Sequence, residues 1–401
     1  MILGGGISGL YAAYTLLQNN PILHITIVEK GSRWGGRIFT DTRLEVETGG
    51  ARFNRDHIHV LQLIDELQLT SKIEPIDNKV KIAEEPNQSI ATILLKLGTY
   101  NTLDFGHDLT KYTLEEYMHM VLSDHEVEFL KDSIGYYAEI VVMNAKDAIH
   151  LLQHLAQPFF SLKDGLSQLI HEMVRRLKMY PYCTMKLNEE VISVRATKHG
   201  YYKKEGYTVK TSQQVYSVPW CICTLEKNVV QKLGLGIKGL NYLTNGPLCR
   251  IFCTFEKPWY KSMPKFTSKT PLRIIIPHNK CIQLSYSDHK FAIFWQQVYA
   301  KYGVAGVNRS LVYFVKDALG IDIPMPLTTH VHFWSYGVAY WCKNANSEKL
   351  SPYFQEPLPN FYLCSDAYSS TFQQWMEGGL GMSAEACRRI ISKEVEPVVT
   401  V

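Results

Sequence analysis

The feature that most constrains this chain is a glycine-rich turn close to its N-terminus. Glycines stand at Gly4, Gly6 and Gly9, after a short apolar segment and before a helix-like stretch. An apolar strand over 25–28 then ends in Glu29, twenty residues after Gly9. This order of turn, helix, strand and acid predicts a βαβ unit that binds a dinucleotide.

Each part of this unit has a physical task. We expect Gly4 to allow the tight turn, Gly6 to let the backbone approach a pyrophosphate, and Gly9 to let helix and strand pack closely. Unpaired N–H groups at the start of the helix bind phosphate, and Glu29 accepts hydrogen bonds from ribose hydroxyls. Further contacts to the dinucleotide are expected from Ile7, Ser8 and Lys30.

Composition excludes several classes of function. The 401 residues suffice for two domains, and a net charge of +4 without a long basic run predicts no nucleic-acid partner. Nine scattered cysteines without a C-x-x-C motif indicate reduced thiols. No apolar run of roughly eighteen residues occurs and no signal peptide precedes the first strand, so we expect a cytoplasmic protein without a membrane span. His150 and His154 lack a third ligand nearby, so no metal is expected.

Apolar periodicity gives a coarse map of the elements. Helices are predicted over 56–69, 113–155, 165–177 and 310–319, and one more that begins near Gly378. Strands are predicted over 185–194, 207–211, 218–224, 252–255, 273–276, 282–286, 291–298 and 329–334, with a hairpin tip at 199–206 and a last strand from Phe361. Residues 72–104 read as short strands and loops.

At this point the chain resembles the flavin-containing amine oxidase family over nearly its whole length. Five segments carry the resemblance: the glycine turn with Glu29, R-W-G-G-R at 33–37, E-T-G-G-A-R-F at 47–53, K-L-N-E-E-V at 186–191, and 363–379 with its ending W-M-E-G-G. Their order and spacing fit the family, which is more specific than any single motif.

The resemblance implies an α/β fold with two domains. A Rossmann-like FAD-binding domain would comprise residues 1–55, 156–228 and 350–401. A substrate domain with a mixed sheet would comprise residues 56–155, which are largely helical, and 229–349.

The resemblance also implies FAD as the cofactor. Arg37 would neutralise pyrophosphate charge, and Asp366 would contact the FAD chain, although a solvated Arg37 and a helix-capping Asp366 are alternatives. The helix after Trp375 would direct its positive end at the flavin, which gains negative charge on reduction. Besides the residues of the βαβ unit named above, the FAD contacts implied are Gly36, Arg37, Gly50, Ala51, Arg52, Val191, Asp366 and Met376. Cys342 lacks a surrounding Gly-Gly-Cys-Tyr pattern, so the FAD is expected to be non-covalent.

Arg52 is the sharpest clue to the substrate. In the L-amino-acid oxidase branch of the family, the matching arginine binds the substrate α-carboxylate, a task that suits a planar guanidinium. An ion pair of Arg52 with Glu45, Glu47 or Asp56 is the alternative. Trp375 would form an aromatic wall at the flavin face, or be an ordinary core residue. Tyr336 and Tyr340 are candidates for lining the pocket, and Tyr136 and Tyr137 are weaker candidates for a lid.

Arg250 departs from the family pattern. The segment around it resembles one in which a lysine holds a water beside flavin N5 and helps reoxidation or imine hydrolysis. Arginine keeps the positive charge but is bulkier and cannot be deprotonated. A catalytic role is therefore assigned to Arg250 and Trp375, with slow oxidase turnover or another electron acceptor as an open question.

These observations lead to a functional hypothesis: FAD-dependent oxidation of a primary amine, most plausibly an L-amino acid. Hydride transfer from Cα to flavin N5 would give an imine, then a keto acid, ammonia and hydrogen peroxide. The expected partners are the small-molecule amine and oxygen, and the oligomeric state stays open, with a homodimer among the options. The alternatives are a polyamine or monoamine oxidase, and a flavin-binding protein without oxidase activity.

Overall fold

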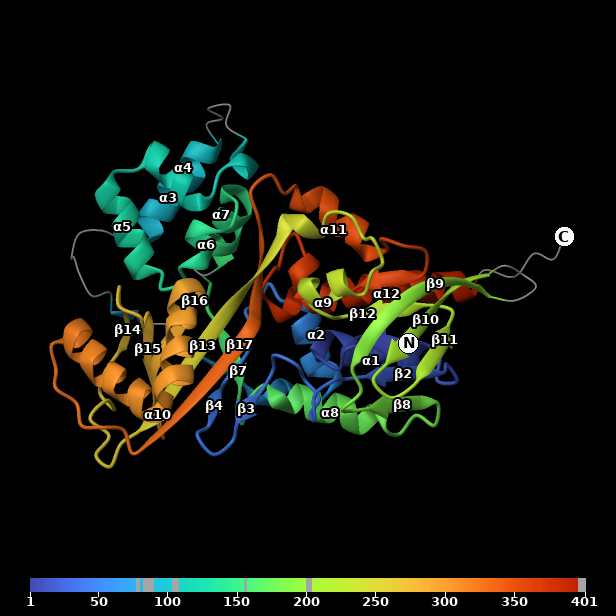
Figure 1. Ribbon diagram of the computed structural model, residues 1–401, viewed down its shortest axis with the longest axis horizontal. Helices are drawn as coiled ribbons and strands as arrows, with labels where there is room; N and C mark the ends of the chain where they lie inside the picture. Colours follow the sequence, from blue (N-terminus) through green and yellow to red (C-terminus); the bar gives the residue numbers. More distant parts are fainter. Residues whose placement is uncertain (77–79, 82–89, 103–107, 155–156, 200–203, 396–401) are drawn as a thin grey trace.

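The computed structural model describes residues 1–401 apart from 77–79, 82–89, 103–107, 155–156, 200–203 and 396–401 (Figure 1). Two β-sheet regions lie side by side, and a group of short helices, α3 to α7, lies above one of them. The fold is a mixed α/β architecture, as the sequence predicts. The division into domains at the boundaries given above remains a prediction.

A five-stranded parallel sheet carries the glycine turn. Its strands stand in the order β18-β12-β1-β2-β8. They are β18 (Phe361–Leu363), β12 (Cys221–Cys223), β1 (Ile2–Leu3), β2 (Ile25–Val28) and β8 (Cys183–Lys186). The four strands other than β8 are almost completely buried, which is typical of a parallel sheet covered on both faces. Helix α1 (Ile7–Asn19) packs on this sheet between α12 (Met376–Val395) and α8 (Ser167–Leu177).

A small antiparallel sheet extends this region. It consists of β9 (Val191–His199), β10 (Lys204–Thr211) and β11 (Val215–Val218). The Tyr207 ring of β10 lies 5.3 Å from that of Phe361, and its hydroxyl donates to the carbonyl of Pro359 at 2.6 Å. The predicted hairpin is therefore present, although its tip at 200–203 lies outside the described residues.

The second large sheet has six strands in the order β17-β13-β16-β15-β14-β6. They are β17 (Thr328–Trp341), β13 (Leu243–Thr254), β16 (Ile282–Asp288), β15 (Ile274–Pro277), β14 (Lys265–Thr267) and β6 (Val80–Lys81). All neighbours pair antiparallel except β14 and β6. The long helix α10 (His289–Leu319), kinked at Gly303, covers this sheet and buries Trp295 in a second apolar core.

The helical group follows from strong local signals. It comprises α3 (Ile90–Thr102), α4 (Leu114–Val121), α5 (Asp124–Ser133), α6 (Ala138–Val141) and α7 (Ala145–His154). Capping boxes start two of the helices: Thr113 with Glu116 begins α4, and Ser123 with Glu126 begins α5. The last residue of the predicted helical stretch, 155, lies outside the described residues.

Short elements connect these regions. They are the strand pairs β3 (Thr40–Asp41) with β4 (Val46–Glu47) and β5 (Ile73–Pro75) with β7 (Phe160–Leu162), and the helices α2 (Ile58–Glu66), α9 (Lys227–Lys232) and α11 (Ser347–Gln355). Single 3-10 turns lie at Thr70–Lys72, Leu109–Lys111, Leu240–Tyr242 and Asp366–Tyr368.

Two predicted elements are wrong. Residues 90–102 form helix α3 where strands and loops were expected, because Ile90, Ile93, Leu94 and Leu97 recur at helical spacing within a polar context. The predicted strand 291–298 lies in α10, where its aromatic residues face the sheet on one side of a helix. Helix α12 begins at Met376, two residues before the predicted start.

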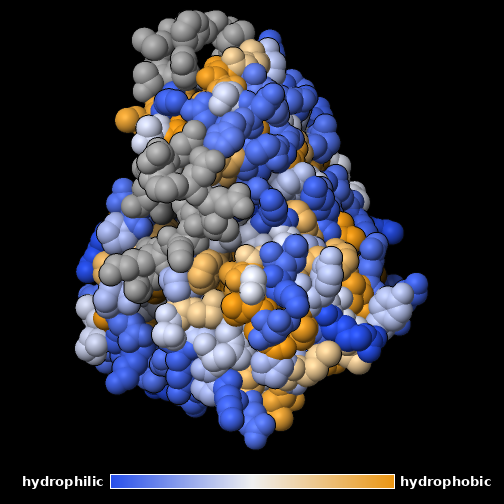
Figure 2. All heavy atoms as spheres, turned by 90° about the vertical axis from the view of Figure 1, so that its left-hand side faces the viewer, coloured by the Kyte–Doolittle hydropathy of each residue, from blue (hydrophilic) through white to orange (hydrophobic). Residues whose placement is uncertain are grey.

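The surface on the α10 side is mostly hydrophilic, with separate apolar patches (Figure 2). Helix α10 contributes exposed apolar side chains at Ile293, Val304 and Tyr313. Among the described residues, no helix is both long and apolar enough to cross a membrane.

Candidate active site

The glycine turn leaves an open cradle at the N-terminus of α1. Gly4 has φ +107°, and a Cβ at Gly9 would lie 2.1 Å from the Gly4 carbonyl oxygen, so neither position accepts a side chain. At Gly6 the nearest atom to such a Cβ would be 3.9 Å away, which leaves open space. No side chain caps α1, so the first N–H groups, at Ile7 and Ser8, remain available for phosphate.

The predicted ribose-binding acid is held firmly at the end of β2. Glu29 Oε2 accepts from the Gly5 N–H at 2.9 Å, and Oε1 accepts from the Gly31 N–H at 2.7 Å. Lys30 beside it is exposed, and the N–H of Glu189 donates to the Glu29 carbonyl at 2.9 Å. The segment that leads to Val191, which is 9% exposed at the start of β9, therefore runs next to Glu29.

The Gly-Gly-Arg segment joins the N-terminal and C-terminal parts of the chain. Arg37 donates to both carboxylate oxygens of Asp366 and to the carbonyl of Gly337 at 3.0 Å. Gly36 has φ +54°, and a Cβ there would lie 3.2 Å from the Cα of Gly6. Three predicted cofactor residues, distant in sequence, thus meet beside the glycine turn.

Two helix N-termini converge on this place. A Cβ at Gly379 of α12 would lie 2.4 Å from the Ser8 hydroxyl of α1 and 3.4 Å from the Asp366 N–H, so the two helices are packed closely. The Ser383 hydroxyl donates to the Ser8 carbonyl at 3.1 Å. Met376 is the first residue of α12. The positive ends of both helix dipoles therefore face the same region, which favours an anionic cofactor.

This arrangement fits a flavin dinucleotide. The open space at Gly6 and the uncapped N–H groups suit a pyrophosphate, while Glu29 suits a ribose. The buried Oε2 of Glu226 has no hydrogen-bond partner among the described residues, and burial raises the pKa of Glu226 to about 7 against the opposing charge of Arg37. An unpartnered carboxyl beside Arg37 is a polar group that a bound ligand can satisfy.

Arg52 belongs to residues 47–53, which follow the Gly-Gly-Arg segment in the sequence. The Gly50 N–H donates to the Arg37 carbonyl at 2.9 Å, and a Cβ at Gly49 would lie 1.8 Å from that oxygen. This close backbone approach fixes Ala51 and directs the following Arg52 away from it. Gly50, which the sequence assigns to the cofactor, thus lies against the Arg37 backbone.

Arg52 and Trp375 come together, although 323 positions separate them. The Arg52 guanidinium lies 4.1 Å from the centre of the Phe159 ring and 5.6 Å from that of Trp375. The Phe159 and Trp375 rings stack at 5.4 Å with an angle of 11°. Arg52 also donates to the Tyr136 hydroxyl at 3.2 Å. The indole N–H of Trp375 is buried without a partner among the described residues.

The ion pair considered for Arg52 is absent among the described residues. Glu45 pairs with Lys280 at 2.8 Å, and the Glu47 carboxylate accepts from the Thr40 hydroxyl and the Leu166 N–H. Asp56 forms no ion pair with Arg52 either. The guanidinium is therefore a charge that the described part of the fold does not neutralise.

Arg250 is linked to Arg52 through the rings of Tyr286 and Tyr136. It is buried, donates to the Glu47 carbonyl at 2.7 Å, and lies 4.1 Å from the centre of the Tyr286 ring. The Tyr286 ring in turn meets that of Tyr136 edge to face at 5.5 Å. Arg52, Tyr136, Tyr286 and Arg250 thus form one continuous row of side chains.

The two tyrosines proposed on β17 have different environments. Tyr336 is half-buried, whereas Tyr340 is 1% exposed, and its hydroxyl has no partner among the described residues. Burial and the charges of Glu139 and Asp288 raise the pKa of Tyr340 well above its usual value. Tyr340 is therefore a buried wall residue, while Tyr336 is more accessible.

Sequence reasoning missed Tyr286 and Lys265. Burial, then the positive charges of Arg52 and Arg250, lower the pKa of Lys265 to about 8. We call Arg52, Arg250 and Lys265 the cationic cluster. None of the three forms an ion pair with a residue that the structure describes.

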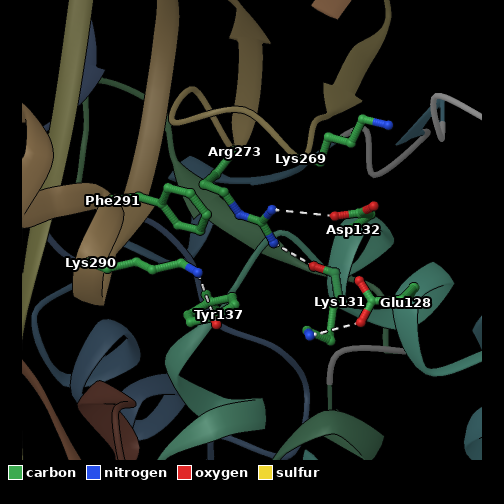
Figure 3. A pocket seen from close by; sticks show the side chains of 8 residues that line it. All are labelled: Glu128, Lys131, Asp132, Tyr137, Lys269, Arg273, Lys290 and Phe291. Carbon is green, nitrogen blue, oxygen red and sulfur yellow. Dashed lines mark hydrogen bonds and ion pairs between the residues drawn. The ribbon is translucent and has the colours of Figure 1, made fainter. Parts of the chain in front are cut away.

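A second group of charges lines a pocket of about 160 Å³ where α5, the β14–β15 connection and the start of α10 meet (Figure 3). Its lining residues are Glu128, Lys131, Asp132, Tyr137, Lys269, Arg273, Lys290 and Phe291. Arg273 is 1% exposed and donates to the carbonyls of Ser268 at 3.0 Å, Gly135 at 3.2 Å and Lys131. We call Arg273, together with the three backbone carbonyls that accept its hydrogen bonds, the Arg273 clasp. Its hydrogen bonds lie within the fold, so we assign it to structure.

Comparison with known proteins agrees with this geometry. The model of the family described as flavin containing amine oxidoreductase matches residues 7–391. An uncharacterized protein of Acanthamoeba polyphaga mimivirus is 31% identical over 103 residues, which cover 24% of this chain and 20% of that protein. The chain thus matches only about a fifth of the length of this relative.

Solved structures share the fold over nearly the whole chain. Putrescine oxidase with putrescine bound has a TM-score of 0.75, and a double mutant of that enzyme with redesigned cofactor binding has 0.77. A candidate protoporphyrinogen oxidase of Exiguobacterium sp. 255-15 has 0.71. Each is 16% identical in sequence, and the match covers 98% of both chains. The match of the family model over nearly the whole chain shows that this protein belongs to the flavin-containing amine oxidoreductase family.

Proposed function

We propose that this protein oxidises the primary amine of an L-amino acid, with FAD as its cofactor. When bound, FAD would supply the hydride acceptor at flavin N5, with oxygen as the final electron acceptor that is reduced to hydrogen peroxide. The amino acid loses its Cα hydrogen to give an imine, which water converts to a keto acid and ammonia. The observation that carries this proposal is the Arg52 guanidinium, which forms no ion pair with a described residue and lies beside the stacked rings of Phe159 and Trp375.

The chain's own residues supply binding and orientation. Within the described part of the chain, Arg52 has one side-chain hydrogen bond, to Tyr136, which leaves most of its donors for a carboxylate. A planar guanidinium binds a carboxylate through two parallel, charge-assisted hydrogen bonds and so fixes the substrate's orientation. Phe159 and Trp375 provide an apolar surface that excludes water from the reacting carbon.

The positive charges also favour the reactive form of the substrate. Hydride loss from Cα requires a neutral amine, because the nitrogen lone pair must assist it. Nearby Arg250 disfavours a second positive charge and so lowers the pKa of a bound ammonium group. No side-chain base is therefore needed in this proposal.

Oxidation of a diamine is the second candidate. The fold shared with putrescine oxidase motivates it, but recognition of a cationic amine needs acidic or aromatic groups. The cationic cluster disfavours a doubly positive substrate. A third candidate, a flavin-binding protein without oxidase activity, is motivated by Arg250 in place of the family's lysine.

The proposal is tested by comparing Arg52→Met with Arg55→Met. Arg55 is exposed and lies 4.5 Å from the Phe160 ring centre, so it is a matched arginine on an aromatic ring outside the cluster. We expect Arg52→Met to raise KM for every oxidised L-amino acid by about 30-fold or more, the effect of losing a charge-assisted pair. Arg55→Met should leave KM unchanged. An unchanged KM in Arg52→Met would refute the assignment of Arg52.

A further inference from the structure

Lys265 lies on the side of β14 that faces the row formed by Arg52, Tyr136, Tyr286 and Arg250. Successive side chains of a strand point to opposite faces, so Lys265 and Thr267 share one face, and Phe266 packs into the second apolar core on the other. The Thr267 methyl lies 3.6 Å from where a Cβ of Gly135 would be, and Gly135 directly precedes Tyr136. Lys265 therefore projects toward the same segment that carries Tyr136.

Among the described residues, the charges that act on Lys265 are those of Arg52 and Arg250. The pKa of Lys265 falls to about 8 through burial and the charges of Arg52 and Arg250. Burial and the neighbouring Asp288 carboxylate raise the pKa of Glu139 well above its usual value, which favours the neutral form of this acid. Asp288 accepts from the N–H groups of Tyr137 and Ala138 and is thus already engaged at the start of α6.

The cationic cluster has no counter-ion among the residues that the structure describes, which is unfavourable for folding. A buried charge is normally paired, because removing it from water costs free energy that only a partner offsets. Arg250 and Arg52 donate to neutral groups, and the Lys265 ammonium group has no hydrogen-bond partner among the described residues. A single α-carboxylate at Arg52 neutralises only one of the three charges.

We propose that Lys265 binds a second carboxylate on the substrate, so that the amino acid oxidised is a dicarboxylic one. This inference rests on the proposed function, in which Arg52 binds the α-carboxylate. Lys265 suits the second group because an ammonium is a compact donor that does not impose one orientation on its ligand. The bound carboxylate favours the charged form of Lys265. Lys265 thus determines specificity toward acidic side chains.

Binding without turnover gives the first test. Glutarate, butyrate and 1,4-diaminobutane are titrated into the FAD-loaded protein by isothermal calorimetry. We expect glutarate to bind at least about tenfold more tightly than butyrate, as the loss of one charge-assisted bond implies. Lys265→Met should abolish this difference, while Lys265→Arg should retain most of it. Lys269→Met, an exposed lysine of the Arg273 clasp pocket, is the matched control and should change nothing.

Turnover gives the second test, with L-glutamate against L-glutamine as substrates of equal size. We expect kcat/KM for L-glutamate to exceed that for L-glutamine by at least about tenfold in the wild type and to match it in Lys265→Met. Equal kcat/KM in the wild type would overturn the role of Lys265 and leave the amino-acid oxidase proposal intact. Glutarate binding that depends on Lys265, without oxidation of any amino acid, would support the anion site and reject the proposed function. Tighter binding of 1,4-diaminobutane than of glutarate would overturn both.

Discussion

The Arg273 clasp and the cationic cluster use the same kind of residue for opposite purposes. Arg273 is buried and donates to three backbone carbonyls, with Asp132 3.7 Å away. Arg250 is also buried and Arg52 is half-buried, but they contact aromatic rings and single neutral acceptors. The difference teaches that a satisfied buried cation stabilises the fold, whereas an unsatisfied one marks a place where a ligand supplies the missing charge.

Removal of the clasp should give the largest effect on stability. Arg273→Met leaves buried carbonyls without donors, and we expect the free energy of unfolding to fall by about 3–5 kcal/mol. Urea unfolding followed by tryptophan fluorescence measures it. Lys269→Met in the same pocket should change stability by less than about 0.5 kcal/mol, since the residue is exposed. An unchanged urea midpoint in Arg273→Met would break the comparison.

Replacing Arg250 by lysine, the residue that the family resemblance implies at this position, should change the rate at which the reduced flavin is reoxidised. Arg250→Lys keeps the positive charge at this position. A lysine can exchange a proton with a neighbouring water, whereas an arginine cannot be deprotonated. We expect reoxidation of the reduced flavin by oxygen to become about tenfold faster or more, the lower range of acid–base effects. Stopped-flow mixing of reduced protein with oxygen measures it. A slower reaction than in the wild type would show that Arg250 is adapted to its place.

Replacing Lys265 should raise the free energy of unfolding at pH 7, whereas replacing Arg273 should lower it. The pKa of Lys265 is about 8 in the folded state and 10.5 ordinarily, so the unfolded chain binds more protons between these values. The free energy of unfolding should therefore rise with pH from about 8 to about 10.5. Lys265→Met should flatten this rise and stabilise the protein at pH 7. A decrease in stability at pH 7 would indicate that Lys265 is part of the structural framework.

Arg52 should show the smallest effect on stability. Because it contributes one hydrogen bond and contacts with aromatic rings, Arg52→Met should change the free energy of unfolding by no more than about 1 kcal/mol. Thermal unfolding of the FAD-loaded protein measures this. A loss comparable to that of Arg273→Met would mean that both arginines serve the fold.

How much the sequence could predict depends on whether the signal was local. The glycine turn, Glu29 and the start of α1 lie within one βαβ unit, so their spacing was sufficient. Arg52 and Trp375 were each placed at the substrate site through the family resemblance, but the resemblance did not predict their contact with one another. Tyr286 and Lys265 could not be found in this way, because strand pairing between β14, β15 and β16 brings them to the site and no local spacing records it.

The misassigned segments have a similar explanation. The stretch 291–298 is rich in aromatic residues, which favour strands, yet α10 buries Ala292 and Trp295 on one helical face against the sheet. Tertiary packing thus overrode the local preference. The buried environment of Tyr340 likewise follows from its contact with Gly246 of the paired strand, where a Cβ would lie 2.7 Å from the ring.

The most direct measurement of the central claim is anaerobic reduction of the bound flavin. The purified yellow protein is mixed, without oxygen, with a pool of L-amino acids or with a pool of polyamines, and the visible band of the oxidised flavin is followed. The account predicts that the amino-acid pool bleaches the band and that Arg52→Met slows the bleaching, while polyamines leave it unchanged. Bleaching by polyamines alone, or by neither pool with FAD clearly bound, would contradict it.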